Sequence, residues 1–257
     1  MLRQQLVRVV ARLGSGRLRQ LESVAQLAQG KGWGSATVAE EVSAVRKLLA
    51  DLAEGELVVL DVGANIGAWT RQALTQLPQA QIHVFEPGAA AFAELSLAFS
   101  GNPRVSLNRL ALGLTDQEAV LYANAPGSGL ASLTRRRLNH LGIAFSHQEP
   151  VEVQSLESWA KAAGIDAVDI LKLDVEGHEL DVLNGAGQLL MGVRLIQFEF
   201  GGCNIDTRTF FQDFWYLLSG KFRLYRLGPG GLFPIESYTE HDETFTTTNY
   251  FAARHLT

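Results

Sequence analysis

The chain has little of what marks a secreted, membrane-spanning or nucleic-acid-binding protein. Its 257 residues include one cysteine, Cys203, which cannot form an internal disulfide or a cysteine-based zinc site. No unbroken apolar run is long enough for a secretion signal or a transmembrane helix. The formal net charge of -5 gives no general attraction to DNA or RNA. We therefore expect a cytoplasmic protein that does not bind nucleic acid.

The chain does have enough apolar residues for one sizeable core. Hydrophobic residues make up 47% of it, and a single α/β domain is common at this length. The first 54 residues predict helical turns that break at Gly14 to Gly16 and at Gly30 to Gly34. From Leu57 onward, short β-branched runs alternate with helical patterns, which is typical of a mostly parallel sheet with helices on both faces. We therefore expect an N-terminal helical extension, residues 1–54, and one α/β domain, residues 55–257.

Seven core strands are expected, and the last two are expected to form an antiparallel hairpin. The strands are predicted at residues 57–61, 81–85, 105–108, 168–173, 194–198, 222–227 and 245–252. Helices are predicted at residues 68–77, 89–99, 134–140, 179–190 and 207–219. Between the strands expected at 105–108 and 168–173 the alternation of strand and helix patterns lapses, apart from a possible short strand at 120–122. We expect residues 124–150 to form an insertion that acts as a lid over an acceptor site.

The first residues are basic and partly apolar. Arg3, Arg8, Arg12, Arg17 and Arg19 all precede the first acid, Glu22. Apolar residues recur near helical spacing at Leu2, Leu6, Val9, Val10 and Leu13. Three interpretations stay open: a segment lying on an anionic membrane, a contact with another subunit, or a solvated helix that covers one edge of the domain.

A glycine turn follows the first expected strand. In Asp61-Val-Gly-Ala-Asn-Ile-Gly67 an apolar strand ends and a helix begins, where glycine lets the backbone approach a ligand. A dinucleotide fingerprint that starts at Gly63 would need glycine at position 65, where the chain has Asn65. A nicotinamide-dependent oxidoreductase is therefore the less favoured alternative. Asn65 can still adopt the left-handed conformation that a tight turn requires.

Two carboxylates indicate which ligand this turn would bind. Asp61 at the strand end suits a cationic group and would repel a pyrophosphate. Glu86 ends the second expected strand about twenty residues after the glycine turn, where it can accept hydrogen bonds from ribose hydroxyls. The pair predicts S-adenosylmethionine, which has a sulfonium centre and a ribose. A non-catalytic module that binds this cofactor as a scaffold or sensor remains a further alternative.

A second acidic cluster follows the expected strand at 168–173. Asp174 ends this strand, Glu176 lies in the turn, and Glu179 lies where a helix begins, which also suits simple stabilisation of the helix N-terminus. In an open α/β sheet, ligands bind outside the carboxyl ends of the strands. We therefore expect Asp174 to share a crevice with Asp61.

From about residue 57 to its C-terminus the chain resembles the FkbM family of methyltransferases. The resemblance is carried by Leu60-Asp-Val-Gly-Ala-Asn-Ile-Gly67, Val84-Phe-Glu-Pro87, Ala111-Leu-Gly113, Leu171-Lys-Leu-Asp-Val-Glu-Gly-His-Glu179 and Val182-Leu-Asn-Gly-Ala186. It implies the Rossmann-like sheet of a class I methyltransferase, S-adenosylmethionine as cofactor, and methylation of a hydroxyl group on a sugar, glycolipid or natural product. The acceptor would thus be a small or sugar-like molecule.

The resemblance also implies roles for individual residues. The methionine part of the cofactor would be lined by Asp61, Gly63, Asn65 and Gly67. Glu86 would hold the ribose, and the adenine would be bordered by Asn108, Ala111 and Leu112. Asp174 and Glu176 match the family's acidic motif near the transferred methyl group.

An acceptor hydroxyl needs a base, because a neutral hydroxyl is a poor nucleophile. Asp174 is the first candidate, His178 the second and Glu199, after the strand at 194–198, the third. Mg²⁺ could be held by Asp174, Glu176 and Glu199, but no spacing demands it, and we predict no metal site. The basic run at residues 135–137 either binds an acidic group of the acceptor or is solvated.

Overall fold

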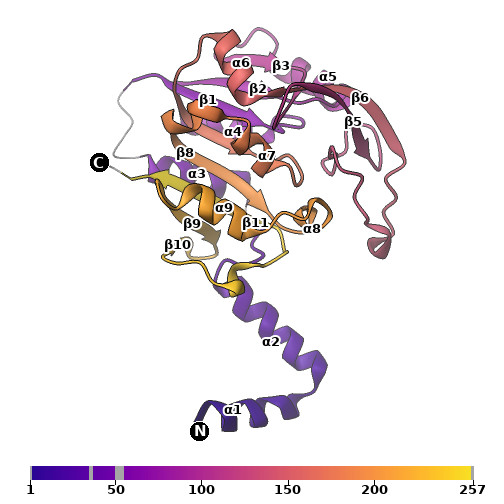
Figure 1. Cartoon of the computed structure of the whole chain (residues 1–257), viewed down its shortest axis with the longest axis vertical. Helices are drawn as coiled ribbons and strands as arrows, with labels where there is room; N and C mark the ends of the chain where they lie inside the picture. The colour runs from indigo at the N-terminus through magenta and orange to yellow at the C-terminus, as the bar shows by residue number, and fades with distance from the viewer. Residues whose placement is uncertain (1, 35–36, 50–54, 256–257) are drawn as a thin grey trace.

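The computed structural model describes residues 2–34, 37–49 and 55–255. Its centre is an eight-stranded sheet with the strand order β10-β9-β11-β8-β7-β1-β2-β3. The parallel strands are β1 (Leu57–Val62), β2 (Ala80–Phe85), β3 (Val105–Asn108), β7 (Val168–Leu173) and β8 (Val193–Phe200). The antiparallel strands are β9 (Phe222–Gly228), β10 (Gly231–Ile235) and β11 (Thr248–Arg254). The expected mostly parallel sheet with a C-terminal hairpin is confirmed (Figure 1).

The expected count of seven core strands is wrong, because the sequence pattern hid β10. This strand contains Pro234, which cannot donate a backbone hydrogen bond and is tolerated on an edge strand. The hairpin is therefore formed by β9 and β10. The final strand, β11, lies between β9 and β8 and is antiparallel to both.

Helices cover both faces of the main sheet. One face carries α3 (Val38–Leu48), α4 (Ala68–Gln76) and α5 (Ala89–Phe99). The other carries α6 (Leu156–Ala163), α7 (Glu179–Asn184) and α9 (Phe211–Leu218). Neighbouring strand residues point to opposite faces, so Val59 packs with the first set of helices and Leu60 with the second.

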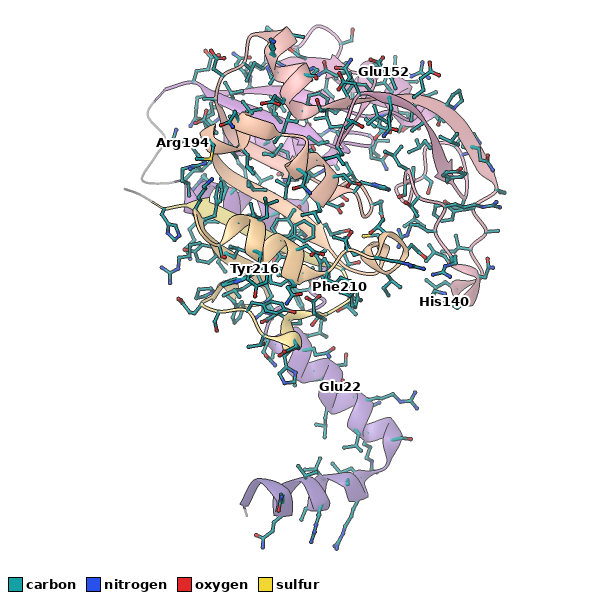
Figure 2. The ribbon with its side chains drawn as sticks, viewed as in Figure 1. Glu22, His140, Glu152, Arg194, Phe210 and Tyr216 are labelled. Carbon is teal, nitrogen blue, oxygen red and sulfur yellow. The ribbon has the colours of Figure 1, made fainter. Side chains whose placement is uncertain are left out.

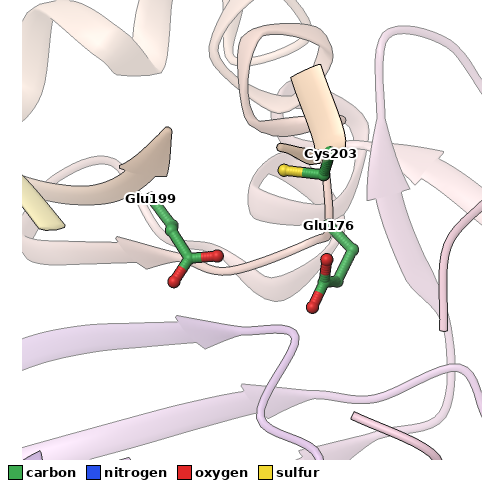
Figure 3. Close-up of side chains that lie close together, drawn as sticks. All are labelled: Glu176, Glu199 and Cys203. Atoms are coloured by element: carbon green, nitrogen blue, oxygen red, sulfur yellow. The ribbon is translucent and has the colours of Figure 1, made fainter. Parts of the chain in front are cut away.

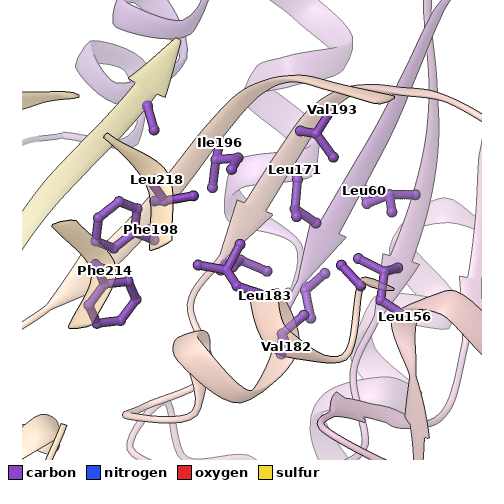
Figure 4. Packing of buried hydrophobic residues seen from close by; sticks show 14 of the residues in the cluster. Leu60, Leu156, Leu171, Val182, Leu183, Val193, Ile196, Phe198, Phe214 and Leu218 are labelled. Atoms are coloured by element: carbon purple, nitrogen blue, oxygen red, sulfur yellow. The ribbon is translucent and has the colours of Figure 1, made fainter. Parts of the chain in front are cut away.

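The register of the central strands builds one continuous apolar layer under α7. Leu60 is the register partner of Leu171, which in turn pairs with Ile196. All three are fully buried and pack in one cluster with Val182 and Leu183 of α7 (Figure 4). Truncating such a side chain to alanine typically costs about 2 to 5 kcal/mol. This layer fixes the strand ends that carry the acidic motif.

Two expected helices are shorter than predicted. The helix expected at 179–190 ends at Asn184 and is followed by a 3-10 turn, Gly187–Gly192. Gly185 packs there against the backbone of Gly113, where a side chain would not fit. The helix expected at 207–219 corresponds to α9, Phe211–Leu218, and a separate short helix, α8 (Cys203–Thr207), precedes it.

The region between β3 and β7 is more ordered than expected. It forms a second sheet of β4 (Ala111–Gly113), β6 (His147–Ser155) and β5 (Gln117–Ala123), in that order. The expected insertion at 124–150 therefore ends before His147. The helix expected at 134–140 is wrong, because only Asn139–Leu141 forms a 3-10 turn.

The helical part of the N-terminal extension is confirmed, but the extension is shorter than 54 residues. Within α3, Val42 and Val45 are fully buried in the cluster beneath α4, so this helix belongs to the domain core. The segment that stands apart from the body consists of α1 (Leu2–Val10), a 3-10 turn (Ala11–Leu13) and α2 (Ser15–Ala28) (Figure 1). In the described part of the chain, we find no helix with the length and apolar character needed to cross a bilayer.

Two matched glycine variants test the packing of the turn that opens α4. Gly67 and Gly101 have φ of 79° and 77°, so alanine is strained at both, by about 1 to 2 kcal/mol. An added Cβ would lie 2.3 Å from Cε2 of Phe99 at Gly67, but would meet nothing within 4 Å at Gly101. We expect Gly67→Ala to lower the free energy of unfolding by about 1 to 3 kcal/mol more than Gly101→Ala. Equal losses in chemical denaturation would contradict this packing.

Candidate active site

A pocket opens at the carboxyl ends of β1, β2 and β7. It holds about 670 Å³ of space, its open mouth included. Eight of the residues predicted from the sequence line it: Gly63, Asn65, Glu86, Ala111, Leu112, Asp174, Glu176 and His178. Four others do not: Asp61, Gly67, Asn108 and Glu199.

The glycine turn forms one wall of this pocket by close backbone contact. Gly63 has a φ of 76°, and a Cβ there would lie 1.9 Å from the carbonyl oxygen of Asp174. No other residue type fits between these two loops. Asn65 has a φ of 49°, so its expected left-handed conformation is confirmed. The turn therefore brings the loops after β1 and β7 together.

Asp61 lies behind the pocket and not on its surface. Its carboxylate is fully buried, 3.0 Å from Nζ of Lys172, and accepts a hydrogen bond of 2.5 Å from the hydroxyl of Thr70. The negative charge is thus balanced inside the protein. The structure does not place Asp61 where it could contact a cationic ligand, in contrast to the expectation from the sequence.

Lys172 is one of the residues that sequence reasoning missed. Its ammonium group also lies 3.6 Å from the carboxylate of Asp174 and donates to the carbonyl of Gly63 at 3.2 Å. Burial acts to lower the pKa of Lys172, but the charges of Asp61 and Asp174 outweigh it and raise that pKa. The available signal was a lysine between two leucines of a core strand, because a buried lysine requires a counter-charge.

Two other expected ligand contacts also have structural roles instead. Asn108 donates to the carbonyl of Val84 at 3.1 Å and accepts from the indole of Trp159 at 3.3 Å, so it joins β3 to β2 and α6. Gly67 begins α4 against Phe99. Neither residue borders the pocket.

Glu86 faces the pocket from the end of β2. Its two carboxylate oxygens accept hydrogen bonds from the backbone of Asn65 at 2.9 Å and of Gly88 at 2.8 Å. Burial raises the pKa of Glu86, although these backbone hydrogen bonds oppose the shift. The carboxylate is thus fixed in orientation, and each oxygen keeps a lone pair for a hydroxyl donor.

The loop after β7 is tied down by Glu179. This side chain is fully buried and accepts hydrogen bonds from the backbone of Val175 at 3.0 Å and of Gly177 at 3.1 Å. Burial raises the pKa of Glu179 to about 7, against the effect of the backbone hydrogen bonds. Glu179 therefore holds the loop that presents Asp174 and His178 to the pocket.

His178 is oriented from both sides of its ring. Its Nδ1 lies 2.7 Å from the carboxylate of Asp181, and its Nε2 lies 2.9 Å from the hydroxyl of Thr134. A carboxylate at Nδ1 favours the tautomer with the proton on that nitrogen, which leaves Nε2 as an acceptor. Asp181 and Thr134 were not predicted as site residues. Asp174 also faces the pocket, with 44% of its side chain exposed.

The segment before β6 closes over this loop. The hydroxyl of Ser132 donates to the carbonyl of Glu176 at 2.8 Å, and Arg136 forms an ion pair with the carboxylate of Glu176. Arg137 pairs with Asp206 at 3.3 Å. Two arginines of the basic run are thus bound to acids of the protein itself.

Glu176, which lines the pocket, lies together with Glu199 and Cys203, which do not (Figure 3). Their possible metal-ligand atoms all lie within 4.8 Å of one another, and Asp174 is not part of this group. Burial and Asp174 raise the pKa of Glu176 to about 8, although Arg136 acts to lower it. Burial and the neighbouring acids also raise the pKa of Glu199. Arg136 already supplies a positive charge at this cluster.

The chain belongs to the FkbM methyltransferases: the model described as "Methyltransferase FkbM domain" matches residues 61–227. It is 29% identical over 164 residues to the 2-O-methyltransferase NoeI of Sinorhizobium fredii, covering 60% of this chain and 68% of NoeI. It is 28% identical over 142 residues to Methyltransferase 1 of Beauveria bassiana, covering 49% of this chain and 57% of that protein. The alignments thus span little more than half to two thirds of these relatives.

Structural comparison supports the fold. The CurJ carbon methyltransferase superimposes with a TM-score of 0.50 at 11% identity, covering 92% of this chain and 58% of that one. The sheet and the family identify a class I Rossmann-like methyltransferase. The alternative of an oxidoreductase is therefore wrong, and the predicted family is confirmed.

Removing the lysine behind the pocket tests whether it balances the buried acid. We expect Lys172→Met to lower the free energy of unfolding by about 3 to 5 kcal/mol, because it leaves the buried Asp61 charge unpaired. Adding Asp61→Asn should restore part of this loss, since asparagine is neutral and can still accept from Thr70. Chemical denaturation of the single and double variants measures both effects. Normal stability of Lys172→Met would contradict the pairing.

Proposed function

We propose that this methyltransferase transfers the methyl group of S-adenosylmethionine to a hydroxyl oxygen of a sugar, glycolipid or natural product. The pocket beside a histidine that is oriented by a carboxylate carries the proposal. Membership of the FkbM family supports the cofactor, and the printed name of NoeI, a 2-O-methyltransferase, supports an oxygen acceptor. The cytoplasmic location expected from the sequence stays a prediction.

The pocket's residues fit S-adenosylmethionine in its chemistry. Leu110, Leu112 and Leu121 give an apolar wall for a purine, and the carboxylate of Glu86 can accept from ribose hydroxyls. Gly63 and Asn65 present a backbone turn to a polar tail. The cofactor supplies an electrophilic methyl carbon on a sulfonium sulfur. The buried Asp61 would contribute by holding the turn and not by contact.

His178 is the base that the geometry supports best. Nε2 already contacts a hydroxyl, that of Thr134, at a distance suited to proton transfer. Asp181 holds the ring and would stabilise the imidazolium that forms. Asp174, the first candidate from the sequence, is paired with Lys172 and would position the acceptor. Glu199, the third candidate, does not line the pocket.

The segment at 124–146 fits the expected lid over the acceptor. Its residues 128, 129 and 131–133 line the pocket, and Thr134 and Arg136 contact the loop after β7. We propose that the acceptor hydroxyl replaces Thr134 at Nε2 of His178. The lid would then select acceptors by what fits beneath it.

Cofactor binding is tested by titrating S-adenosylhomocysteine in a calorimeter. We expect Glu86→Gln to weaken binding about tenfold or more, because a charge-assisted hydrogen bond contributes about 1.5 to 3 kcal/mol. Glu94→Gln, an exposed change on α5, is the matched control and should bind normally. Equal affinity of all three proteins, each folded by its melting curve, would remove Glu86 from the site. No binding by the unmodified protein would refute the proposed cofactor.

Turnover separates the two candidate bases. With an acceptor found by screening sugars and glycolipids, we expect His178→Gln to slow methyl transfer about a hundredfold or more at unchanged cofactor affinity. Asp181→Asn should slow it less, because the ring keeps its place but loses the carboxylate that stabilises the imidazolium. His140→Gln, an exposed histidine of the lid, is the control. Loss of transfer in Asp174→Asn with normal rates in His178→Gln would assign the base to Asp174.

A further inference from the structure

The N-terminal helices form an arm that is held at its base but free along its length. The arm comprises α1, the 3-10 turn and α2, and it extends away from the body (Figures 1 and 2). Neither α2 nor the 3-10 turn contributes a buried residue. At the base, Lys31 lies 3.8 Å from Asp242, and the backbone of Gly32 donates to Thr248 at 2.8 Å. The chain is therefore tied to the body just after the arm, and within the described residues neither the turn nor α2 is buried against it.

The arm exposes apolar side chains that a solvated helix would not need. The large hydrophobic residues exposed along it are Val7, Val9, Leu13, Leu21 and Val24. Val7, Val9 and Val24 each expose at least 60% of their surface. Val9 and Leu13 are four residues apart, so they lie near one another on one side of the arm. Exposed apolar side chains on a projecting basic element suit a surface that a partner covers.

The arm and the rest of the chain also differ in the sign of their net charge. Residues 1–21 hold five of the chain's 22 basic residues and none of its 27 acids. The rest of the chain thus has 17 basic and 27 acidic residues, a net charge of -10. An anionic surface would attract the arm and repel the body. This division allows contact through the arm alone.

We infer that the arm docks on an anionic phospholipid bilayer. Basic side chains beside exposed apolar ones suit the interface between headgroups and acyl chains, where α1 would lie in the membrane plane. In a dimer formed by two arms, the five arginines of one arm would face the five arginines of the other. Glu22 is the single acid in α1, the turn and α2. Like charges would oppose that pairing. The inference does not depend on the proposed function.

Vesicle co-sedimentation of the full chain tests this inference. We expect binding to phosphatidylcholine vesicles that contain phosphatidylglycerol, weak binding to phosphatidylcholine alone, and loss of binding as salt is raised. The triple variant Arg8→Gln, Arg12→Gln, Arg17→Gln should bind on the order of a hundredfold more weakly. Val9→Ser with Leu13→Ser should also weaken binding, because both charge and apolar contact contribute.

The matched control neutralises three exposed basic residues of the body, as Arg46→Gln, Lys47→Gln, Lys161→Gln. It should bind like the unmodified protein. Three results would overturn the inference: equal binding to both vesicle types, an equal loss in the control, or a dimer in sedimentation analysis that the arm variants abolish. The last result would assign the arm to a contact between subunits.

Discussion

A buried carboxylate at the centre of a sheet needs a cation beside it, and this requirement organises the site. Asp61 of β1 is the register partner of Lys172 of β7, so the two side chains point to the same face and meet at 3.0 Å. The same ammonium group reaches the carbonyl of Gly63 and the carboxylate of Asp174. One lysine thus links the first strand, the glycine turn and the acid at the pocket edge.

The pocket follows from how closely the two loops approach. Gly63 allows the carbonyl of Asp174 into the space that a Cβ would fill. Glu179 holds the rest of the loop after β7 by accepting its backbone hydrogen bonds. That loop carries His178 to the side of the pocket, where Asp181 orients its ring. The other side is formed by Glu86, fixed by two backbone donors. Glu86 and His178 therefore face one space from the ends of different strands.

Much of this arrangement could be predicted because it depends on local pattern and parallel topology. Glycine turns, strand-end acids and the left-handed Asn65 follow from short-range sequence, and parallel strands bring their ends to one edge. The pairing of Asp61 with Lys172 could not be predicted in the same way. A carboxylate at a strand end suits a cationic ligand or a buried lysine equally well, and the choice depends on the register between β1 and β7. The roles of Thr134 and Asp181 likewise depend on how a long loop packs.

The pocket between Glu86 and His178 is the proposed binding site of S-adenosylmethionine, and a crystal structure with S-adenosylhomocysteine would test this. We expect the ribose hydroxyls on the carboxylate of Glu86, the adenine against Leu112, and the sulfur on the side of His178, with Asp61 still paired to Lys172. A ligand bound elsewhere, or an Asp61 side chain that has turned outward to contact the ligand, would show that the proposed site is wrong.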